Sequence, residues 1–309
     1  MNNIICIAGP TASGKTTLAV ELAKELDGEI VSCDSMQVYR HMDIGTAKPT
    51  QEEQQGIPHH MLDVAEPDED FSVSRYCAQA GPIVEDILAR GKTAIIAGGT
   101  GLYMDSLIRG NDFAPFPSTG VRERLESRAD TEGVDVLFAE LTAVDPEAAE
   151  RIKDRKRLIR ALEVYYETGE TITAHNKRTQ AIPPRFSPLW LGLDFENRQT
   201  LYDRIDQRVT IMLQQGLIAE IQKLLASGIP ESCTAMQAIG YKEFVAALEG
   251  RGTIAEAADQ VRQSSRRYAK RQLTWFKRNK AMHWLIRGDQ EPPQEILARA
   301  RQLLRDFDN

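Results

Sequence analysis

The sequence predicts an α/β fold in which helices cover both faces of a parallel sheet and a helical segment is inserted into the chain. Short apolar runs alternate with helical patterns over residues 3–99 and again over residues 188–286, as in sheets built from parallel strands and crossover helices. In between, the pattern is helical only, and the proline-rich segments "FAPFPSTG" and "IPPRF" bracket it. We therefore expect a core of residues 1–112 and 185–309 and a helical insertion at 113–184.

The first half of the expected core alternates buried strands with helices. The run "IICIA" ends at Gly9-Pro10 and has neither a basic flank nor a cleavage pattern, which favours a buried strand over a signal peptide. "KTAIIAGG" is a similar run. His59 and His60 are expected in a loop, without a metal, because no third ligand is in view. The expected elements are strand 3–8, helix 15–26, strand 29–33, helix 72–90 and strand 92–99.

The second half resumes the alternation after the insertion. "PLWLGLDF" and "MHWLI" are the apolar runs that predict strands. In the last long helix, Val261, Tyr268 and Trp275 follow a helical spacing and are expected on its buried side. The expected elements are strand 188–195, helix 198–226, helix 240–249, helix 254–280 and strand 282–286.

Composition excludes several classes of protein. The 309 residues are 42% hydrophobic and 27% charged, as in ordinary globular proteins. No apolar run approaches the ~20 residues of a membrane helix, so no membrane partner is expected. The four cysteines are scattered without a C-x-x-C pair, which argues against a zinc site or a disulfide framework and favours a reducing, cytoplasmic location.

The charge is unevenly distributed along the chain. The net charge of −7 by itself argues weakly against a nucleic-acid partner. However, "VRQSSRRYAKRQLTWFKRNK" at 261–280 contains eight cations and no acid, and "RIKDRKRLIR" at 151–160 contains six cations and one aspartate. Such runs either bind nucleic-acid phosphates or form a solvated helix face, and the runs alone do not decide between the two.

The segment "GPTASGKT" matches the phosphate-binding P-loop pattern at every specified position. It lies where the motif requires, after a predicted strand and at the start of a predicted helix. Its backbone N–H groups surround an anion, the lysine adds a positive charge, and the Thr16 hydroxyl can hold Mg²⁺. The phosphate-binding residues expected here are Gly9, Pro10, Thr11, Ala12, Ser13, Gly14, Lys15 and Thr16.

Two polar residues follow other strands at the same expected edge of the sheet. P-loop hydrolases usually have an aspartate at the end of another strand to help hold Mg²⁺, but here strand 92–99 is followed by Gly98-Gly99-Thr100. The nearest acid is Asp34, after strand 29–33. Because the carboxyl ends of such strands line the ligand crevice, Asp34 and Thr100 are expected beside the bound phosphates. The alternative is that Asp34 only forms a turn.

Arg204 and Arg208 lie four residues apart in "LYDRIDQRV" and therefore share a helix face. They would either clamp a diphosphate or form solvated salt bridges with Asp203 and Asp206. The spacing does not decide between these two possibilities.

A set of motifs in this order resembles the tRNA dimethylallyltransferase family: "GPTASGKT", "DSMQVYRHMDIGTAKP", "GGTGLY", "RLIRALEVY", "RIDQRV", "AIGYKE" and "AKRQLTWF". The likeness covers about residues 3–286. It implies a P-loop nucleotide-kinase-like core and transfer of a dimethylallyl group from dimethylallyl diphosphate to the N6 amine of the adenosine immediately 3′ of the tRNA anticodon, position 37. Without the cysteines of a C-terminal zinc finger, the chain is similar to the compact bacterial members, and we expect a cytoplasmic monomer.

The resemblance also implies roles for particular residues. The loop would hold the donor's diphosphate with Mg²⁺ on Thr16, and Arg208 with Arg204 would stabilise the leaving group. Asp34 would accept the proton of the amine, and Thr100 would lie near the diphosphate. The anticodon stem-loop of the tRNA would be contacted by Asp34, Ser35, Met36, Gln37, Thr100, Arg122, Lys156, Arg157, Leu158, Ile159, Arg160, Gln237, Ala238, Ile239, Gly240, Tyr241 and Lys242.

Two other classes of function remain open from the sequence. One is a small-molecule enzyme on the same core, either a P-loop kinase or an adenylate prenyltransferase. The other is a non-catalytic RNA-binding protein with a vestigial loop. The two basic clusters argue against a small acceptor, and the intact Gly14-Lys15-Thr16 with Asp34 argues against a vestigial loop. Many relatives have a His-Pro-Asn-Asp run before the segment that begins at Arg157, where this chain is shorter.

Overall fold

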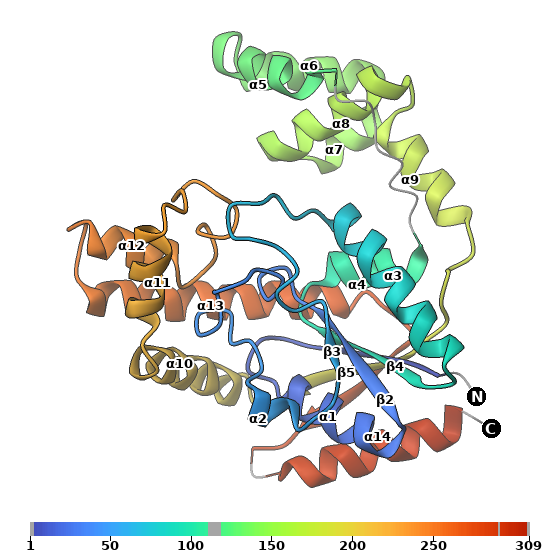
Figure 1. Cartoon of the computed structure of the whole chain (residues 1–309). Helices are drawn as coiled ribbons and strands as arrows, with labels where there is room; N and C mark the ends of the chain where they lie inside the picture. The colour runs from blue at the N-terminus through green and yellow to red at the C-terminus, as the bar shows by residue number, and fades with distance from the viewer. Residues whose placement is uncertain (1–2, 111–118, 290, 308–309) are drawn as a thin grey trace. The chain divides into compact units, whose positions relative to one another are not determined.

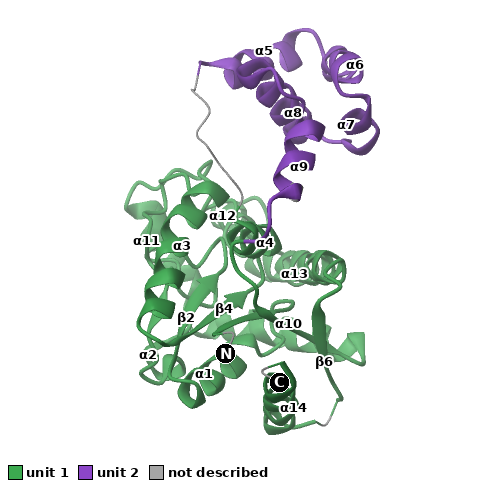
Figure 2. Cartoon of the chain, turned by 90° about the vertical axis from the view of Figure 1, so that its right-hand side faces the viewer, with its two compact units in different colours: residues 1–110, 185–309 green, residues 111–184 purple. Residues whose placement is uncertain are grey.

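The computed structural model describes residues 3–110, 119–289 and 291–307. The chain forms two compact units, which Figure 2 shows in green and purple. The core unit is Met1–Gly110 with Arg185–Asn309, and the insertion unit is Asn111–Pro184. The second expected domain boundary, between 184 and 185, falls where the two units divide, whereas the first, between 112 and 113, lies outside the described residues.

The core unit is built on a six-stranded parallel sheet with the strand order β3-β2-β4-β1-β5-β6. Its central strands are apolar and buried because helices cover both faces. The sheet confirms the predicted α/β class and all five predicted strands. The strands are β1 (Ile4–Ala8), β2 (Gly28–Cys33), β3 (His59–His60), β4 (Thr93–Gly98), β5 (Leu189–Phe195) and β6 (Met282–Arg287).

Strand β3 corrects the expectation of a loop at His59 and His60. These residues pair in parallel with Ile30 and Val31 of β2. The ring of His60 hydrogen-bonds with the carboxylate of Glu29 at 2.8 Å, so a polar contact accompanies the strand pairing. No cluster of metal-ligating side chains exists among the residues that the structure describes.

Helices lie on both faces of this sheet, as Figure 1 shows. Alternate residues of β1 point to opposite faces, so that Ile5 and Ile7 pack with α1 and α14 while Cys6 packs on the other side. The helices of the core unit are α1 (Lys15–Glu25), α2 (Gln51–Gln54), α3 (Val73–Ala89), α4 (Gly101–Arg109), α10 (Arg198–Gln214), α11 (Leu217–Ala226), α12 (Lys242–Leu248), α13 (Ile254–Phe276) and α14 (Pro293–Phe307).

Two helix predictions need correction. The helix expected at 198–226 is two helices, because Gly216 adopts a left-handed φ of 99° between α10 and α11. The helix expected to reach residue 280 ends at Phe276. Helices α2, α4 and α14 were not predicted. No helix in the described part of the chain is long and apolar enough to cross a membrane.

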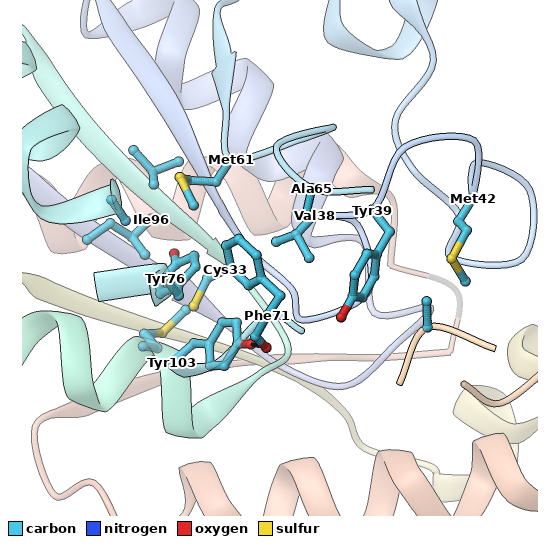
Figure 3. Close-up of a cluster of buried hydrophobic side chains, with 14 of the residues drawn as sticks. Cys33, Val38, Tyr39, Met42, Met61, Ala65, Phe71, Tyr76, Ile96 and Tyr103 are labelled. Carbon is cyan, nitrogen blue, oxygen red and sulfur yellow. Dashed lines mark hydrogen bonds between the residues drawn. The ribbon is translucent and has the colours of Figure 1, made fainter. Parts of the chain in front are cut away.

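A buried aromatic cluster lies against the end of β2 (Figure 3). Tyr76 and Tyr103 stack with ring centroids 4.6 Å apart. The Tyr76 hydroxyl donates a hydrogen bond of 3.0 Å to the carbonyl of Ser32, and the Tyr103 hydroxyl donates one of 3.1 Å to Phe71. The two bonds satisfy the hydroxyls of Tyr76 and Tyr103, and the bond from Tyr76 holds the strand at Ser32, two residues before Asp34.

The described part of the insertion unit, residues 119–184, is helical, with a small core of its own made by α5, α6, α7 and α8. Asp145 joins its parts, because its carboxylate accepts hydrogen bonds from the backbone N–H groups of Ala148 and Thr173. The helices are α5 (Val121–Thr131), α6 (Val134–Val144), α7 (Pro146–Arg151), α8 (Arg155–Thr168) and α9 (Ile172–Ala181).

Candidate active site

The P-loop connects β1 to α1 at the carboxyl edge of the sheet. A Cβ at Gly9 would lie 2.8 Å from the carbonyl oxygen of Leu193, so only glycine fits this close approach. Gly14 has a left-handed φ of 95° as it starts the helix. The Nζ of Lys15 donates a hydrogen bond of 2.6 Å to the carbonyl of Pro10. The ammonium group of Lys15 is therefore held against the backbone of its own loop.

A cavity of about 370 Å³ opens beside this loop, lined entirely by the core unit. It collects most of the predicted site residues of the core, which come from the P-loop, the turn after β2, helix α10 and the segment before α12. The predicted residues that line it are Thr11, Lys15, Thr16, Asp34, Ser35, Met36, Gln37, Arg208, Gln237, Ala238, Ile239, Gly240 and Tyr241.

Asp34 lies at the cavity with one carboxylate oxygen engaged in a turn. Its Oδ1 accepts a hydrogen bond of 2.9 Å from the backbone N–H of Met36, which is an Asx-type turn. The turn-forming interpretation is therefore correct for one oxygen. The other oxygen has no hydrogen bond among the described residues and is left for a ligand.

Thr100 lies beside Asp34 and is not among the residues that line the cavity. Its backbone N–H donates to the carbonyl of Cys33 at 3.2 Å, and its hydroxyl oxygen accepts from the backbone N–H of Ser35 at 3.0 Å. These two bonds bracket Asp34 on both sides. Thr100 thus fixes the turn that carries the carboxylate.

Arg204 and Arg208 of α10 point to the P-loop. Arg208 donates to the hydroxyl of Thr11 at 3.4 Å and to the carbonyl of Ala47 at 3.5 Å. Arg204 donates to the carbonyl of Ala12 at 2.9 Å, although it does not line the cavity.

The alternative of salt bridges with neighbouring aspartates is wrong. Asp206 pairs with Arg266 of α13 at 2.6 Å instead, and Asp203 accepts a hydrogen bond from Gln199. Arg204 and Arg208 are therefore both directed at the P-loop, as a diphosphate clamp requires.

The cavity is electropositive at the P-loop. Burial lowers the pKa of Lys15 to about 7, with the charge of Arg208 acting in the same direction and that of Asp34 opposing both. Burial also lowers the pKa of Arg208. Neither cation forms an ion pair with a carboxylate in the described part of the chain. Two desolvated cations beside a P-loop form a site for a polyanion.

Helix α13 supplies site residues that the sequence did not reveal. Val261, Ser265, Tyr268 and Gln272 follow one helix face, and all four line the cavity together with Arg271. Burial, followed by the charge of Asp34, raises the pKa of Tyr268 to about 12, so its hydroxyl remains a hydrogen-bond donor near neutral pH. Tyr268 was expected in the core, and helical spacing alone does not distinguish a core face from a cavity face.

Gln272 links three parts of the site. Its side-chain oxygen accepts a hydrogen bond of 3.0 Å from the backbone N–H of Thr11, and its amide nitrogen donates one of 2.9 Å to the carbonyl of Gly99. The side chain is buried, and both ends of its amide are satisfied. Helix α13 is thereby joined to the P-loop and to the end of β4.

The loop at 43–47 is a second part of the cavity wall that the sequence indicated only through the family resemblance. Gly45, Thr46 and Ala47 line the cavity. Gln37 donates from its amide nitrogen to the carbonyl oxygens of Thr46 and Ala47 at 3.3 and 3.1 Å. The side chain of Gln37 is thus held in place by the 43–47 loop.

The basic segment 261–280, most of which lies in α13, contains cations with and without ion pairs among the described residues. Arg262 pairs with Asp259, and Lys277 lies 3.6 Å from Asp194. Among the described residues, other exposed cations of this segment have no ion pair. They are Arg267, Lys270, Arg271, Arg278 and Lys280. This arrangement leaves charge for phosphates, while the solvated-face alternative stays open for these residues.

The residues predicted on the insertion unit differ in exposure. Leu158 and Ile159 are buried in its core, so their side chains pack inside the unit. Arg122 and Arg160 both pair with Glu163. The remaining two residues, Lys156 and Arg157, are exposed. In the core unit, Lys242 is exposed at the start of α12 and does not line the cavity.

The chain is similar to known protein families and relatives over nearly its full length. The model of a family described as IPP transferase matches residues 37–279, and that of a family described as isopentenyl transferase matches residues 2–71. A tRNA dimethylallyltransferase of Thermoanaerobacter sp. (strain X514) is 48% identical over 95% of this chain and 94% of the relative. A tRNA dimethylallyltransferase of Acetivibrio thermocellus is 43% identical over 99% of both chains.

Solved structures give the same result. The full-length tRNA isopentenylpyrophosphate transferase of Bacillus halodurans is 40% identical with a TM-score of 0.74, over 99% of this chain and 98% of that chain. A eukaryotic dimethylallyltransferase, solved acting on tRNA, is 28% identical with a TM-score of 0.83, over 99% of this chain and 80% of that chain. The chain therefore belongs to the IPP transferase family, whose members similar to it are tRNA dimethylallyltransferases.

Proposed function

We propose that this enzyme transfers a dimethylallyl group from dimethylallyl diphosphate to the N6 amine of the adenosine immediately 3′ of the tRNA anticodon, position 37, and releases diphosphate. The observation that carries the proposal is the joint presence, in one cavity, of the P-loop, two cations that have no ion pair among the described residues, and the carboxylate of Asp34. The names of the relatives support the same reaction.

The donor's diphosphate would lie on the P-loop, with Lys15 and Arg208 around it. When the allylic C–O bond breaks, its electron pair leaves with the diphosphate, and these cations stabilise the growing charge. The exposed hydroxyl of Thr16 lines the cavity at the start of α1. It fits Mg²⁺, which usually takes few protein ligands and binds substrate phosphates. Bound Mg²⁺ supplies further neutralisation of the diphosphate oxygens.

The acceptor would lie between Asp34 and the prenyl group. The N6 lone pair attacks the allylic carbon, nitrogen gains positive charge, and its proton passes to the free oxygen of Asp34. Thr100 keeps the 34–35 turn in place through its bonds to Cys33 and Ser35, so its proposed role is to position the base. No water needs to be activated, which is consistent with Gly98 and Gly99 at the end of β4, where P-loop hydrolases usually have an aspartate.

The tRNA would be bound by several basic and polar parts of the chain. An adenosine stacked in the anticodon loop must turn out of the stack to enter the cavity. The segment 237–241 and the turn at 35–37 line that cavity and would contact the base. The cations of the 261–280 segment that have no ion pair in the described part of the chain, with Lys156 and Arg157 of the insertion unit, would bind backbone phosphates.

The test offers three acceptors in parallel to the purified protein with Mg²⁺ and radiolabelled dimethylallyl diphosphate. They are an anticodon stem-loop RNA with adenosine 3′ of the anticodon, the same RNA with guanosine there, and free AMP. Label on the adenosine RNA alone is the expected result. Label on AMP would identify an adenylate prenyltransferase instead, and no label on any acceptor would overturn the proposal.

A further inference from the structure

Glu220 of α11 collects four hydrogen-bond donors and no cation among the described residues. Its carboxylate accepts from three consecutive backbone N–H groups, those of Asp43, Ile44 and Gly45, at 2.9, 2.8 and 3.1 Å. The hydroxyl of Tyr241 adds a fourth bond at 2.7 Å. Hydrogen bonds to an ionised carboxylate are stronger than those between neutral groups, so this contact is a firm anchor for the loop at 43–47.

The same loop lies directly on the ring of Tyr241. A Cβ at Gly45 would overlap with the ring and the hydroxyl of Tyr241, which leaves no room for any side chain. Tyr241 is fully buried. Glu220 and Tyr241 therefore hold the loop together. The ring of Tyr241 packs against Gly45, and the carboxylate of Glu220 accepts hydrogen bonds from the loop's N–H groups.

The end of the clamped loop reaches two groups of the active site. The carbonyl of Ala47 accepts a hydrogen bond from Arg208 at 3.5 Å and another from Gln37 at 3.1 Å. Ala47 has a left-handed φ of 48°. Residues other than glycine rarely adopt this backbone conformation, so the surrounding structure must maintain it. The loop would not be expected to keep this shape without its anchor.

We propose that Glu220 is a positioning residue for prenyl transfer. By fixing the 43–47 loop, Glu220 fixes the position of the Ala47 carbonyl. That carbonyl in turn orients Arg208 toward the diphosphate and Gln37 toward the acceptor base. This inference rests on the proposed function, since the roles of Arg208 and Gln37 belong to it. A purely structural clamp would instead stabilise the fold and leave the cavity's ligand affinities unchanged.

The test compares Glu220→Gln with Glu256→Gln. Glu256 also accepts a backbone N–H bond, from Thr253 at 2.8 Å, but it does so in the capping box at the start of α13, and it does not line the cavity. We expect Glu220→Gln to weaken the binding of inorganic diphosphate about tenfold and to raise the KM for the stem-loop RNA by about the same factor. Glu256→Gln should lower Tm while leaving both values unchanged.

Tyr241→Phe keeps the ring that supports the loop and removes one of the four hydrogen-bond donors. It should therefore change the diphosphate affinity and the KM in the same direction but by less. It also keeps the proposal testable if Glu220→Gln does not fold. Unchanged diphosphate affinity and unchanged KM in both folded variants would overturn the proposal. Diphosphate binding needs no acceptor and no transfer. If the wild-type protein transfers no prenyl group, the proposed function fails, while the diphosphate titration still decides whether Glu220 positions Arg208.

Discussion

The backbone N–H of Thr11 donates a hydrogen bond of 3.0 Å to the side-chain oxygen of Gln272, 261 residues further along the chain. The P-loop is thereby attached to the helix that carries the larger basic cluster. The other end of the Gln272 amide donates to Gly99 at the end of β4. One buried side chain thus holds three parts of the site at fixed distances from each other.

Replacing Gln272 should disturb donor binding. Gln272→Leu leaves the partly buried N–H of Thr11 and the buried carbonyl of Gly99 without partners, and the loss at a buried group typically costs about 1–3 kcal/mol. We expect a lower Tm and weaker binding of inorganic diphosphate, measured by calorimetric titration. Gln263→Leu, an exposed glutamine of the same helix, is the matched control. Equal diphosphate affinity for the two variants would show that the bridge does not shape the P-loop.

The proton-accepting role of Asp34 is separable from its turn. Asp34→Asn retains an oxygen that accepts the N–H of Met36, so the turn persists, but the amide does not accept a proton. We expect turnover to fall about a hundredfold or more with diphosphate affinity nearly intact. Asp68→Asn, at an exposed aspartate, is the control. Wild-type turnover in Asp34→Asn would leave Asp34 as a turn former only.

Diphosphate binding should depend on pH through Lys15. Burial and the charge of Arg208 lower its pKa to about 7 in the free protein. An anion favours the charged lysine, so affinity should be level below pH 7 and should fall by up to about tenfold per pH unit above it. The measurement is a titration with inorganic diphosphate between about pH 6 and pH 9. Lys15→Met is the control, because protonation of the diphosphate itself affects its binding to both proteins equally. If affinity changed with pH in the same way for the wild type and Lys15→Met, this assignment would be contradicted.

The network around Glu29 should contribute to acid stability. Hydrogen bonds from Arg90, followed by those from His60 and Lys92, lower the pKa of this buried carboxylate from 4.5 to about 2, against the opposing effect of burial. Its stabilisation is therefore present above pH 4.5 and is lost as the pH falls toward 2.

The corresponding measurement follows Tm against pH for the wild type and Glu29→Gln. The wild type should melt at a higher temperature near neutral pH, and the difference should narrow as the pH falls below 4.5. Asp86→Asn is a control, because Asp86 pairs with the same Arg90 from an exposed position and should contribute little. An equal Tm for wild type and Glu29→Gln at pH 7 would refute the network's role.

The sequence predicts most of this fold because its strands are continuous apolar runs bounded by turn residues, as at Ile4–Ala8 and Thr93–Gly98. Strand β3 was not predictable in this way, since two histidines have no apolar pattern and pair only because β2 lies beside them. A glycine such as Gly216 is tolerated within helices, so only the fold shows that it separates α10 from α11.

The candidate site was predictable where its residues follow strands or a motif, as Asp34 and Lys15 do. Gln272 was not predictable, because its partners Thr11 and Gly99 lie 261 and 173 residues away in the sequence. Tyr268 was placed in the core, since a helix face looks the same in sequence whether it meets a core or a cavity. The 43–47 loop was indicated only by the family resemblance, because its position depends on a carboxylate in α11.

The central claim is that the P-loop holds the diphosphate of a prenyl donor that is transferred to RNA. The most direct measurement is a single-turnover reaction with dimethylallyl diphosphate, Mg²⁺ and the adenosine stem-loop, in which modified adenosine and released diphosphate are both counted. The account predicts equal amounts of the two, and no reaction when ATP replaces the donor. Phosphate transfer or release from ATP, or diphosphate release without modified RNA, would contradict it.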